Sequence, residues 1–429
     1  MKKITLIFNL LFLFVFISEI FAQDWPHYLG PERNSTSPQK GILRSWPASG
    51  PEILWTTNIG PGFGGPVIKD SKVYLLDRDD KTGDIIRCFD FKNGNELWSY
   101  SYNAPGSVSY PGSRSVPAVD GNRVYSCGPY GDLYCLDINT HKPIWNKNIM
   151  KDFGGTKIPV WAVTQCPFIY GDLLIVSYSQ NPNAGLVAFN KLTGKIIWKT
   201  EPIGNETYAS PSVVKIAGED HIVIAFSSTN TYMHKEAPVS IGKIIGLKPQ
   251  TGEIIWEFKN WQNMIQVAPV LDAGEGRIIV VGGYEHGAAM IKVEKMDDGK
   301  YSVKEIFNHN DFGDHTKPPV LYNGYFYAQF STNSKRDGLA CMDMNGKVMW
   351  KTMRSPLFDK GSMILADGLI LATDGRKTLY LIQPDPSGFK PLASAELLGD
   401  GMNWGPMALS DGKLLLRDQN RLLCVSVVN

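Results

Sequence analysis

The sequence has no excess of charge of either sign. Its 429 residues carry 43 Lys and Arg against 42 Asp and Glu, and the net charge is +1. No basic block, arginine stripe or acidic tail occurs. Nucleic-acid binding depends on clustered positive charge that releases counterions, so we expect no nucleic-acid partner. The chain also carries no polybasic signal for a membrane surface.

Several catalytic and cofactor motifs are missing as well. The chain has no CxxCH haem attachment motif, no two adjacent cysteines, and no nucleophile elbow, Walker loop or dinucleotide fingerprint. Glycine-rich strings such as Gly60–Gly65 lead into expected strands, so they present no helix N-terminus to a phosphate. We therefore assign no catalytic residue from motifs.

Long apolar runs are absent except at the N-terminus. Met1–Ala22 places two lysines before an apolar run, and Ala22 suits a cleavage site before Gln23. This order is typical of a secretory signal peptide, so we expect an exported, periplasmic or secreted protein without a transmembrane segment after cleavage. The alternative is an uncleaved anchor, because the run is long. A bacterial lipid anchor requires a cysteine near this junction, and the sequence has none there.

What the chain does contain is a repeated unit. Residues 131–145, GDLYCLDINTHKPIW, have the pattern of a strand, a polar turn and a second strand that ends in tryptophan. The pattern recurs at residues 86–98, 185–198, 243–256 and 338–350. Self-similar units of this length indicate a repeat architecture.

Each unit opens with a short strand led by proline. The eight openings stand at Pro66, Pro117, Pro167, Pro211, Pro269, Pro319, Ser362 and Pro406, with serine replacing proline once. Their separations run from 43 to 58 residues. Proline is tolerated at the first residue of a strand, where its missing N–H removes no ladder bond.

Four short strands fit into each unit. In the second unit we expect them at Val116–Val119, Arg123–Cys127, Asp132–Asp137 and Pro143–Trp145. Eight such units predict an all-β fold, an eight-bladed β-propeller of four-stranded antiparallel blades. An aromatic ring at the end of a unit can cover the backbone of the next blade. These rings are Trp55, Trp98, Trp145, Trp198, Trp256 and Trp350, with Phe307 in the fifth unit and no aromatic near Ala393–Leu397 in the seventh.

The two ends of the repeat region are complementary. Glu52–Ile59 has the pattern of a fourth strand with no preceding three, whereas the unit that begins at Pro406 has three strands and no fourth. We expect the first to complete the second, so that N- and C-terminal strands close the ring and leave no exposed edge there. The propeller would then span residues 52–429. Residues 23–51, which include Trp25, Tyr28 and Trp46, would form a lead-in segment packed on it.

Six cysteines remain in a chain whose export would permit disulfides. Cys88, Cys135, Cys341 and Cys424 fill the same third-strand position of different units. We expect these four to be small core residues and not disulfide partners. The alternative is that Cys127 and Cys135 face each other across one hairpin and form a disulfide.

The loops before the openings should ring one mouth of the central channel, because the first strand of a blade lies nearest the axis. Seven residues in or near these loops are not explained by the repeat: Arg114, Trp161, Tyr208, His315, Lys317, Lys360 and Trp404. Cations, hydrogen-bond donors and aromatic faces in one place suit an anionic, planar or extended ligand. The alternative is that these side chains fill the channel and bond only to each other.

The strongest concentration of polar residues is FNHNDFGDHTKPP at Phe307–Pro319. His309, Asp311, Asp314 and His315 are residue types that bind divalent metals, but their spacing matches no metal signature, so we assign no metal site. The alternative is a hydrogen-bonded loop with Asx turns at Asn310 and Asp311. Glu285 and His286 are expected at a hairpin tip.

The (L/V)xxxDxxTGxxxW pattern resembles the β-propeller repeat of the pyrroloquinoline-quinone (PQQ)-like family. The segment DWPHYLGPERNSTS is similar to the WPxxRGPxxxG opening of secreted members, with Leu29 where Arg is usual. The family includes quinoprotein alcohol and glucose dehydrogenases and a non-enzymatic propeller lipoprotein of the outer-membrane β-barrel assembly machinery. The dehydrogenases have adjacent cysteines and a calcium held by Glu, Asn and Asp, and no motif here matches either.

The resemblance leaves two functions open. The first is a binding scaffold for a protein, glycan or peptide, which needs no cofactor. The alternative is a small oxidoreductase for alcohols or sugars that uses PQQ with calcium. In that case Arg114, Lys317 or Lys360 would pair with the quinone carboxylates, and Trp404 or Trp161 would stack on its rings. The candidates for its base are Asp359 and the group Asp311, Asp314 and His315.

Overall fold

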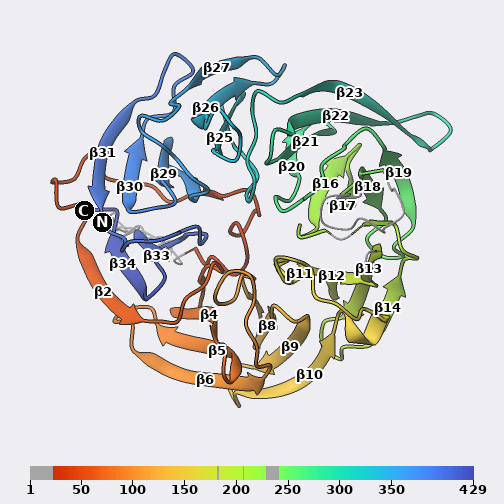
Figure 1. Ribbon diagram of the computed structural model, residues 1–429, viewed down its shortest axis with the longest axis horizontal. Coiled ribbons are helices and arrows are strands. Elements are labelled where there is room, and N and C mark those ends of the chain that lie inside the picture. Colours follow the sequence, from red (N-terminus) through yellow and green to blue (C-terminus); the bar gives the residue numbers. More distant parts are fainter. Residues whose placement is uncertain (1–22, 181–182, 206, 229–240) are drawn as a thin grey trace, which may run out of the picture.

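Eight antiparallel sheets stand in a ring around a central axis, so the chain is an eight-bladed β-propeller as predicted (Figure 1). The computed structural model describes residues 23–429 apart from 181–182, 206 and 229–240. The predicted signal peptide, Met1–Ala22, lies outside the described residues. Within them, no helix has the length and apolar character that crossing a membrane requires.

The first four blades follow one another along the chain. Blade 1 consists of β3 (Val67–Lys69), β4 (Lys72–Asp79), β5 (Gly83–Asp90) and β6 (Glu96–Asn103). Blade 2 consists of β7 (Ala118–Asp120), β8 (Arg123–Cys127), β9 (Asp132–Asp137) and β10 (Lys142–Asn148). Blade 3 consists of β11 (Phe168–Tyr170), β12 (Leu173–Ser179), β13 (Asn183–Asn190) and β14 (Ile196–Lys199), and β15 (Gly204–Asn205) also pairs with β13. Blade 4 consists of β16 (Ser212–Ile216), β17 (Glu219–Phe226), β18 (Lys243–Leu247) and β19 (Ile254–Phe258).

The second half continues the pattern. Blade 5 consists of β20 (Leu271–Gly274), β21 (Arg277–Gly282), β22 (Gly287–Lys295) and β23 (Tyr301–His309). Blade 6 consists of β24 (Val320–Tyr322), β25 (Tyr325–Phe330), β26 (Gly338–Asp343) and β27 (Val348–Lys351). Blade 7 consists of β28 (Met363–Ala366), β29 (Leu369–Thr373), β30 (Thr378–Ile382) and β31 (Pro391–Glu396), with β1 (Thr36–Ser37) beside β28. Blade 8 consists of β32 (Ala408–Ser410), β33 (Lys413–Arg417), β34 (Arg421–Ser426) and β2 (Ile53–Asn58). A short 3-10 turn, η1 (Lys151–Phe153), follows blade 2.

In blades 1 and 2 the first strand begins one residue after the opening proline, and so does not include the proline as the sequence suggested. The middle strands β8 and β9 have the predicted bounds, but the first strand of blade 2 begins at Ala118, after Pro117 and not at Val116. Pro66 likewise precedes β3. Proline has no N–H to give to a ladder, so it sets the entry of the strand from outside.

The ring closes as predicted. Strand β2 pairs antiparallel with β34, with Trp55 opposite Cys424 and Thr57 opposite Leu422. The fourth strand of blade 8 therefore comes from the start of the propeller region and its other three from the end (Figure 1). No edge is left between the first and the last blade, because β2 covers β34.

The end-strand tryptophans dock on the next blade. The indole Nε1 of Trp55 donates to the carbonyl of Phe91 at 3.0 Å, and that of Trp198 donates to Pro249 at 2.9 Å. Trp145 and Trp350 make the same bond to Lys191 and Asp385. Each acceptor lies in the turn between the third and fourth strands of the following blade, so these rings tie neighbouring blades together.

Glycines in those turns allow the close approach. Gly252 has a φ of +71°, and a Cβ there would lie 2.4 Å from the ring of Trp198. Phe307 packs in the same way on Gly346, which confirms its predicted place. Blade 7 has Ala393 at this position, as predicted. In blade 2 the turn carries His141, whose ring stacks on Trp98 at 4.7 Å.

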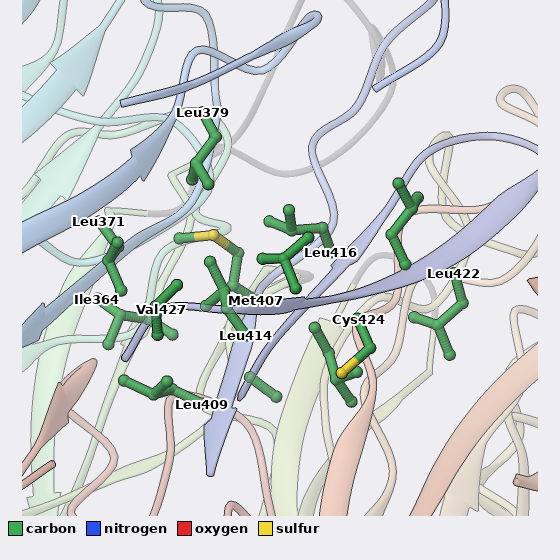
Figure 2. Close-up of a cluster of buried hydrophobic side chains, with 14 of the residues drawn as sticks. Ile364, Leu371, Leu379, Met407, Leu409, Leu414, Leu416, Leu422, Cys424 and Val427 are labelled. Carbon is green, nitrogen blue, oxygen red and sulfur yellow. The ribbon is translucent and has the colours of Figure 1, made fainter. Parts of the chain in front are cut away.

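Apolar side chains form separate clusters between neighbouring blades. The most extensive one lies where the ring closes, between blades 7, 8 and 1, and Trp25 and Ile42 of the lead-in segment join it. Figure 2 shows part of it, including Leu371, Met407, Leu414, Leu422 and Cys424. Burial of this surface contributes roughly 25 cal/mol per Å². Ring closure therefore comes with its own hydrophobic stabilisation.

The cysteines are core residues. All six are buried and free, and Cys88, Cys135, Cys341 and Cys424 lie on third strands as predicted. The alternative of a Cys127–Cys135 bond is wrong, because Cys127 pairs with Leu133 across the hairpin and Cys135 pairs with Tyr125.

The lead-in segment runs along the innermost strands. Trp25 bridges to Ile68 of β3, the carbonyl of Pro26 accepts from Val119 of β7 at 2.8 Å, and β1 pairs in parallel with β28. Asp24 and Gln39 accept from the backbone of Asp70 and Gly412, in the turns that follow β3 and β32, at the ends of these inner strands that are farther from the loops that precede them. The segment therefore covers the channel from the side opposite those loops.

We expect ring closure to depend on β2 and not on the lead-in segment alone. A chain that begins at Thr57 lacks most of β2 and exposes the edge of β34, so it should show no cooperative thermal unfolding by circular dichroism. A chain that begins at Gly50 keeps β2 and should still unfold cooperatively at a lower temperature. If the chain that begins at Thr57 melts at the wild-type temperature, β2 does not hold the ring closed.

Candidate functional site

A pocket of about 180 Å³ opens at one mouth of the channel. The loops that lead into the inner strands form its wall, because each of these strands starts nearest the axis. All seven residues selected from the sequence line it: Arg114, Trp161, Tyr208, His315, Lys317, Lys360 and Trp404. We call it the mouth pocket.

Sequence reasoning missed part of the lining. Phe63 stands three residues before Pro66, in the same register as Arg114 before Pro117, so the register could have found it. Tyr110, Tyr284 and Thr332 lie further from the openings and had no such signal. Tyr284 comes from the segment GGYEHG, where only Glu285 and His286 had been considered.

The floor of the pocket comes from the lead-in segment. Tyr28 of the lead-in segment lines the pocket, and its hydroxyl donates to the carbonyl of Thr316 at 3.4 Å. Burial raises the pKa of Tyr28 well above its ordinary value, so this hydroxyl stays protonated. The segment that covers the opposite side of the channel therefore also bounds the mouth pocket.

Two groups of aromatic side chains line the pocket. The Trp404 group consists of Phe63, Tyr110 and Trp404, with Phe63 and Tyr110 both within 6 Å of the Trp404 ring, at 5.3 and 5.9 Å between centroids. The Trp161 group consists of Trp161, Tyr208, Tyr284 and His315. In it, Trp161 lies 5.4 Å from Tyr208 and 6.1 Å from Tyr284, nearly parallel to the latter. Such rings offer apolar faces to a ligand.

Lys317 ties three loops together. Its Nζ donates to the carbonyl of Trp404 at 2.9 Å, to the carbonyl of Lys360 at 3.1 Å and to Thr316 Oγ1 at 3.2 Å. Burial lowers the pKa of Lys317 to about 8, with Asp314 opposing and Lys360 adding to the effect. At neutral pH the ammonium therefore holds the loops of blades 6, 7 and 8 in place.

Lys360 is paired, and its partner lies outside the pocket lining. Its Nζ lies 2.6 Å from Asp359 Oδ1 and 4.3 Å from the centroid of the Trp404 ring. Burial raises the pKa of Asp359, but the hydrogen bond and charge of Lys360 outweigh it and hold that pKa below its usual value. Asp359 also accepts from Ser331 at 2.7 Å. The Asp359 carboxylate is thus already paired, so it does not suit the role of catalytic base that the sequence analysis considered for it.

Arg114 is a second cation of the lining that bonds to backbone carbonyls and not to a carboxylate. Its guanidinium donates to the carbonyls of Gly112 at 3.0 Å and Tyr110 at 2.7 Å, and within the described residues it forms no ion pair. Burial, followed by the charge of Arg78, lowers the pKa of Arg114 to about 10. The side chain therefore stays positive at neutral pH while facing the pocket.

Three polar atoms of the lining have no hydrogen-bond partner among the described residues: His315 Nδ1, Thr332 Oγ1 and Trp404 Nε1. Burial lowers the pKa of His315 to about 3, with Lys360 and Lys317 contributing, so the imidazole is neutral. A Cβ on Gly283 would lie 2.6 Å from Thr332 Oγ1 and 2.7 Å from His315 Nδ1. Glycine at 283 thus leaves room for both groups.

The polar cluster at Phe307–Pro319 does not converge on one point. Asp311 is exposed and lies 3.5 and 3.6 Å from the ammonium groups of Lys335 and Lys351. Asp314 is buried and accepts from the backbone of Thr316 and Lys317. In the described ranges, no group of three or more His, Cys, Asp or Glu residues is placed to hold a metal. The loop is hydrogen-bonded, but Asp314 caps its turn, not Asn310 or Asp311.

A family model described as outer membrane protein assembly factor BamB matches residues 36–181 and 81–310. The chain belongs to this PQQ-like propeller family. The resemblance seen in the repeat is thereby confirmed. A BamB of Moranella endobia is 20% identical over 356 residues, which cover 74% of this chain and 78% of that protein.

Enzymes share the fold. Quinoprotein ethanol dehydrogenase of Pseudomonas aeruginosa is 28% identical over 165 residues, or 37% of this chain, and the match spans about a quarter of the dehydrogenase, 24%. The crystal structure of BamB from Moraxella catarrhalis has a TM-score of 0.61 at 12% identity and covers 88% of this chain and 99% of that one. A europium-containing methanol dehydrogenase has a TM-score of 0.66 at 14% identity, with coverages of 94% and 89%. These two structures show the fold alone.

We expect Lys317→Met to loosen the rim of the mouth pocket. The carbonyls of Lys360 and Trp404 would lose their donor, and a buried hydrogen bond is worth about 1–1.5 kcal/mol, which corresponds to roughly tenfold faster local opening. Hydrogen exchange of residues 358–361 and 402–406 measures this. Lys377→Met, which removes an exposed ion pair with Asp400, is the control. Equal exchange in both variants would show that Lys317 does not tie the loops.

Proposed function

We propose that this protein is a non-enzymatic binding scaffold of the cell envelope, which holds a protein, glycan or extended peptide at the face that carries the mouth pocket. The observation that carries the proposal is the composition of the pocket lining. It offers seven aromatic rings of Phe, Tyr and Trp and three cationic side chains, and no lining residue is Asp or Glu. Such a set recognises a ligand through stacking and charge and supplies no carboxylate base.

Family membership supports the same function. The matching family model is described as an assembly factor of the outer membrane, and a propeller of this kind presents many loops on one face. The lysine-led apolar run Met1–Ala22 favours export to the envelope. The outer strands supply further edges for an extended partner.

A quinoprotein oxidoreductase for alcohols or sugars is the second candidate, because quinoprotein dehydrogenases share sequence and fold with the chain. Arg114 and Lys360 suit the carboxylates of PQQ, and Trp161 or Trp404 suits its rings. A calcium ion prefers carboxylate and carbonyl oxygens, however, and the lining of the pocket has no carboxylate. The residues present therefore do not fit a cofactor that depends on a metal.

Titration of the purified mature chain with PQQ, with and without calcium, separates the two candidates. Tryptophan fluorescence reports binding, and dye-linked oxidation of simple alcohols and sugars reports turnover. We expect no calcium-dependent binding and no turnover. Saturable, calcium-dependent binding with dye reduction would overturn the scaffold and establish the oxidoreductase.

Partner capture tests the face directly. Envelope extracts are cross-linked to the wild type, to Tyr284→Ala at the pocket rim and to Met296→Ala as a control. Both replaced side chains are 43% exposed, and Met296 lies in the outer hairpin of blade 5. We expect Tyr284→Ala to lose the protein that wild type and Met296→Ala retain. Equal capture by all three would place the partner elsewhere.

A further inference from the structure

The lining of the mouth pocket is rich in hydrogen-bond donors and poor in acceptors. Its charged side chains are all cations, and no lining residue is Asp, Glu, Asn or Gln. The carbonyls of Lys360 and Trp404 already accept from Lys317. Arg114 occupies two further loop carbonyls. A ligand that suits this lining therefore offers acceptors and few donors.

Several donors of the lining have spare capacity. The indole Nε1–H of Trp404 can only donate, and it has no acceptor in the described part of the chain. The hydroxyl of Thr332 has no partner there either. Arg114 donates to two backbone carbonyls, and a guanidinium has five N–H groups. A buried donor left unpaired is costly, so binding of a ligand with acceptors is favoured.

The rings of the lining provide flat apolar walls. In the Trp161 group, the rings of Trp161 and Tyr284 are inclined by only 17°, with their centroids 6.1 Å apart, and Tyr208 lies 5.4 Å from Trp161. The Trp404 group adds three more rings. Aromatic-lined sites of this kind take up the rings of proline residues in extended peptides.

The pocket is too small to enclose a large ligand. Its volume of about 180 Å³ lies below the roughly 300–1,000 Å³ of sites that enclose drug-sized molecules. Apolar side chains continue beyond it on the same loops. Val160, next to Trp161, is 42% exposed. Met402, near Trp404, is 39% exposed. An extended chain that inserts part of its length into the pocket and lies across these side chains contacts both regions.

We propose that the mouth pocket binds a proline-rich segment of a partner protein, with the proline rings against the two aromatic groups and the prolyl carbonyls accepting from Trp404 and Arg114. This assignment rests on the proposed function and deepens it, because it selects an extended peptide among the three classes of partner. Proline has a carbonyl acceptor and no N–H, so such a segment brings acceptors without donors that need pairing. Its polyproline II conformation forms before binding, so little conformational entropy is lost.

The polarity of the lining also disfavours other extended peptides. An ordinary peptide brings one N–H per residue, and a lining with few acceptors leaves these groups unpaired when they are buried. A basic segment is disfavoured further, because Arg114, Lys317 and Lys360 are all cations. Carbonyl oxygens carry a partial negative charge, so a proline-rich segment is complementary to the lining in charge as well.

The test titrates the full mature chain with acetylated and amidated decaproline, by calorimetry and tryptophan fluorescence. A Gly-Ser peptide of equal length with the same end groups is the control. We expect decaproline to bind saturably and roughly tenfold more tightly than the control peptide. Both peptides are uncharged, so added salt should leave the affinity unchanged. Equal affinity for the two peptides, or no saturable binding of decaproline, would overturn the proposal.

A matched pair of variants tests the hydrogen bond. Trp404→Phe keeps a ring in the pocket and removes the indole N–H, so it should weaken decaproline binding about tenfold, the effect of one lost buried hydrogen bond. Trp46→Phe makes the same change outside the pocket lining, at an indole whose Nε1 also has no partner among the described residues. It should bind decaproline as wild type does. Wild-type affinity in Trp404→Phe would contradict the assignment.

Thermal unfolding of each variant checks the fold. Tyr284→Ala, at an exposed position of the rim, is the second test if Trp404→Phe is unstable. It removes one aromatic wall of the Trp161 group and should also weaken decaproline binding. Undiminished binding in this variant would count against the proline assignment.

Competition separates this assignment from the scaffold on which it rests. Excess decaproline added during the cross-linking of envelope extracts should release the protein that the mouth face captures, whereas the Gly-Ser peptide should not. A captured protein that decaproline does not displace would overturn the assignment and leave the scaffold standing. Absence of any captured protein would count against the scaffold, and the calorimetry decides the proline assignment in that case as well.

Discussion

Closure of the ring is the constraint on which the rest of the structure depends. A four-stranded blade has two faces, and each is buried only when a blade stands on either side. The first and last blades would each expose a face without closure. Pairing of β2 with β34 prevents this, and the cluster shown in Figure 2 fills the junction with apolar side chains. Four tryptophans then repeat the same contact around the ring, each donating to a turn of the next blade: Trp55, Trp145, Trp198 and Trp350.

The mouth pocket is a consequence of that closed ring. Its lining comes from loops far apart in the chain, which share only the property of leading into an innermost strand. The ring brings Arg114 of blade 2, Lys317 of blade 6 and Trp404 of blade 8 to one place. Their hydrogen bonds go largely to backbone carbonyls, so the side chains are positioned by loops and leave the charge of Arg114 unbalanced. The mouth pocket therefore carries a net positive charge.

Much of the architecture could be predicted because the repeat acts locally. The strand pattern located β8 and β9 to the residue, and the shared register placed Cys88 and Cys424 on third strands. The same register selected five residues that the structure brings together with two from nearby, Trp161 and His315: Arg114, Tyr208, Lys317, Lys360 and Trp404. These successes depend on periodicity, which every blade repeats.

What could not be predicted depends on contacts that the repeat does not encode. Tyr28 enters the pocket from a segment outside the repeat, so no register applied to it. Asp311 and Asp314 are three residues apart, yet one is exposed and the other caps a buried turn, because the chain bends between them. The sequence left a Cys127–Cys135 bond open as an alternative, because a shift of two residues in hairpin register decides which side chains face each other.

Native mass spectrometry of the protein purified from its own cells, combined with metal analysis, tests the central claim most directly. The account predicts that the mature chain carries neither pyrroloquinoline quinone nor a bound metal. A chain that carries pyrroloquinoline quinone together with a divalent or trivalent metal would contradict it, and would make the mouth pocket the cofactor site of an oxidoreductase.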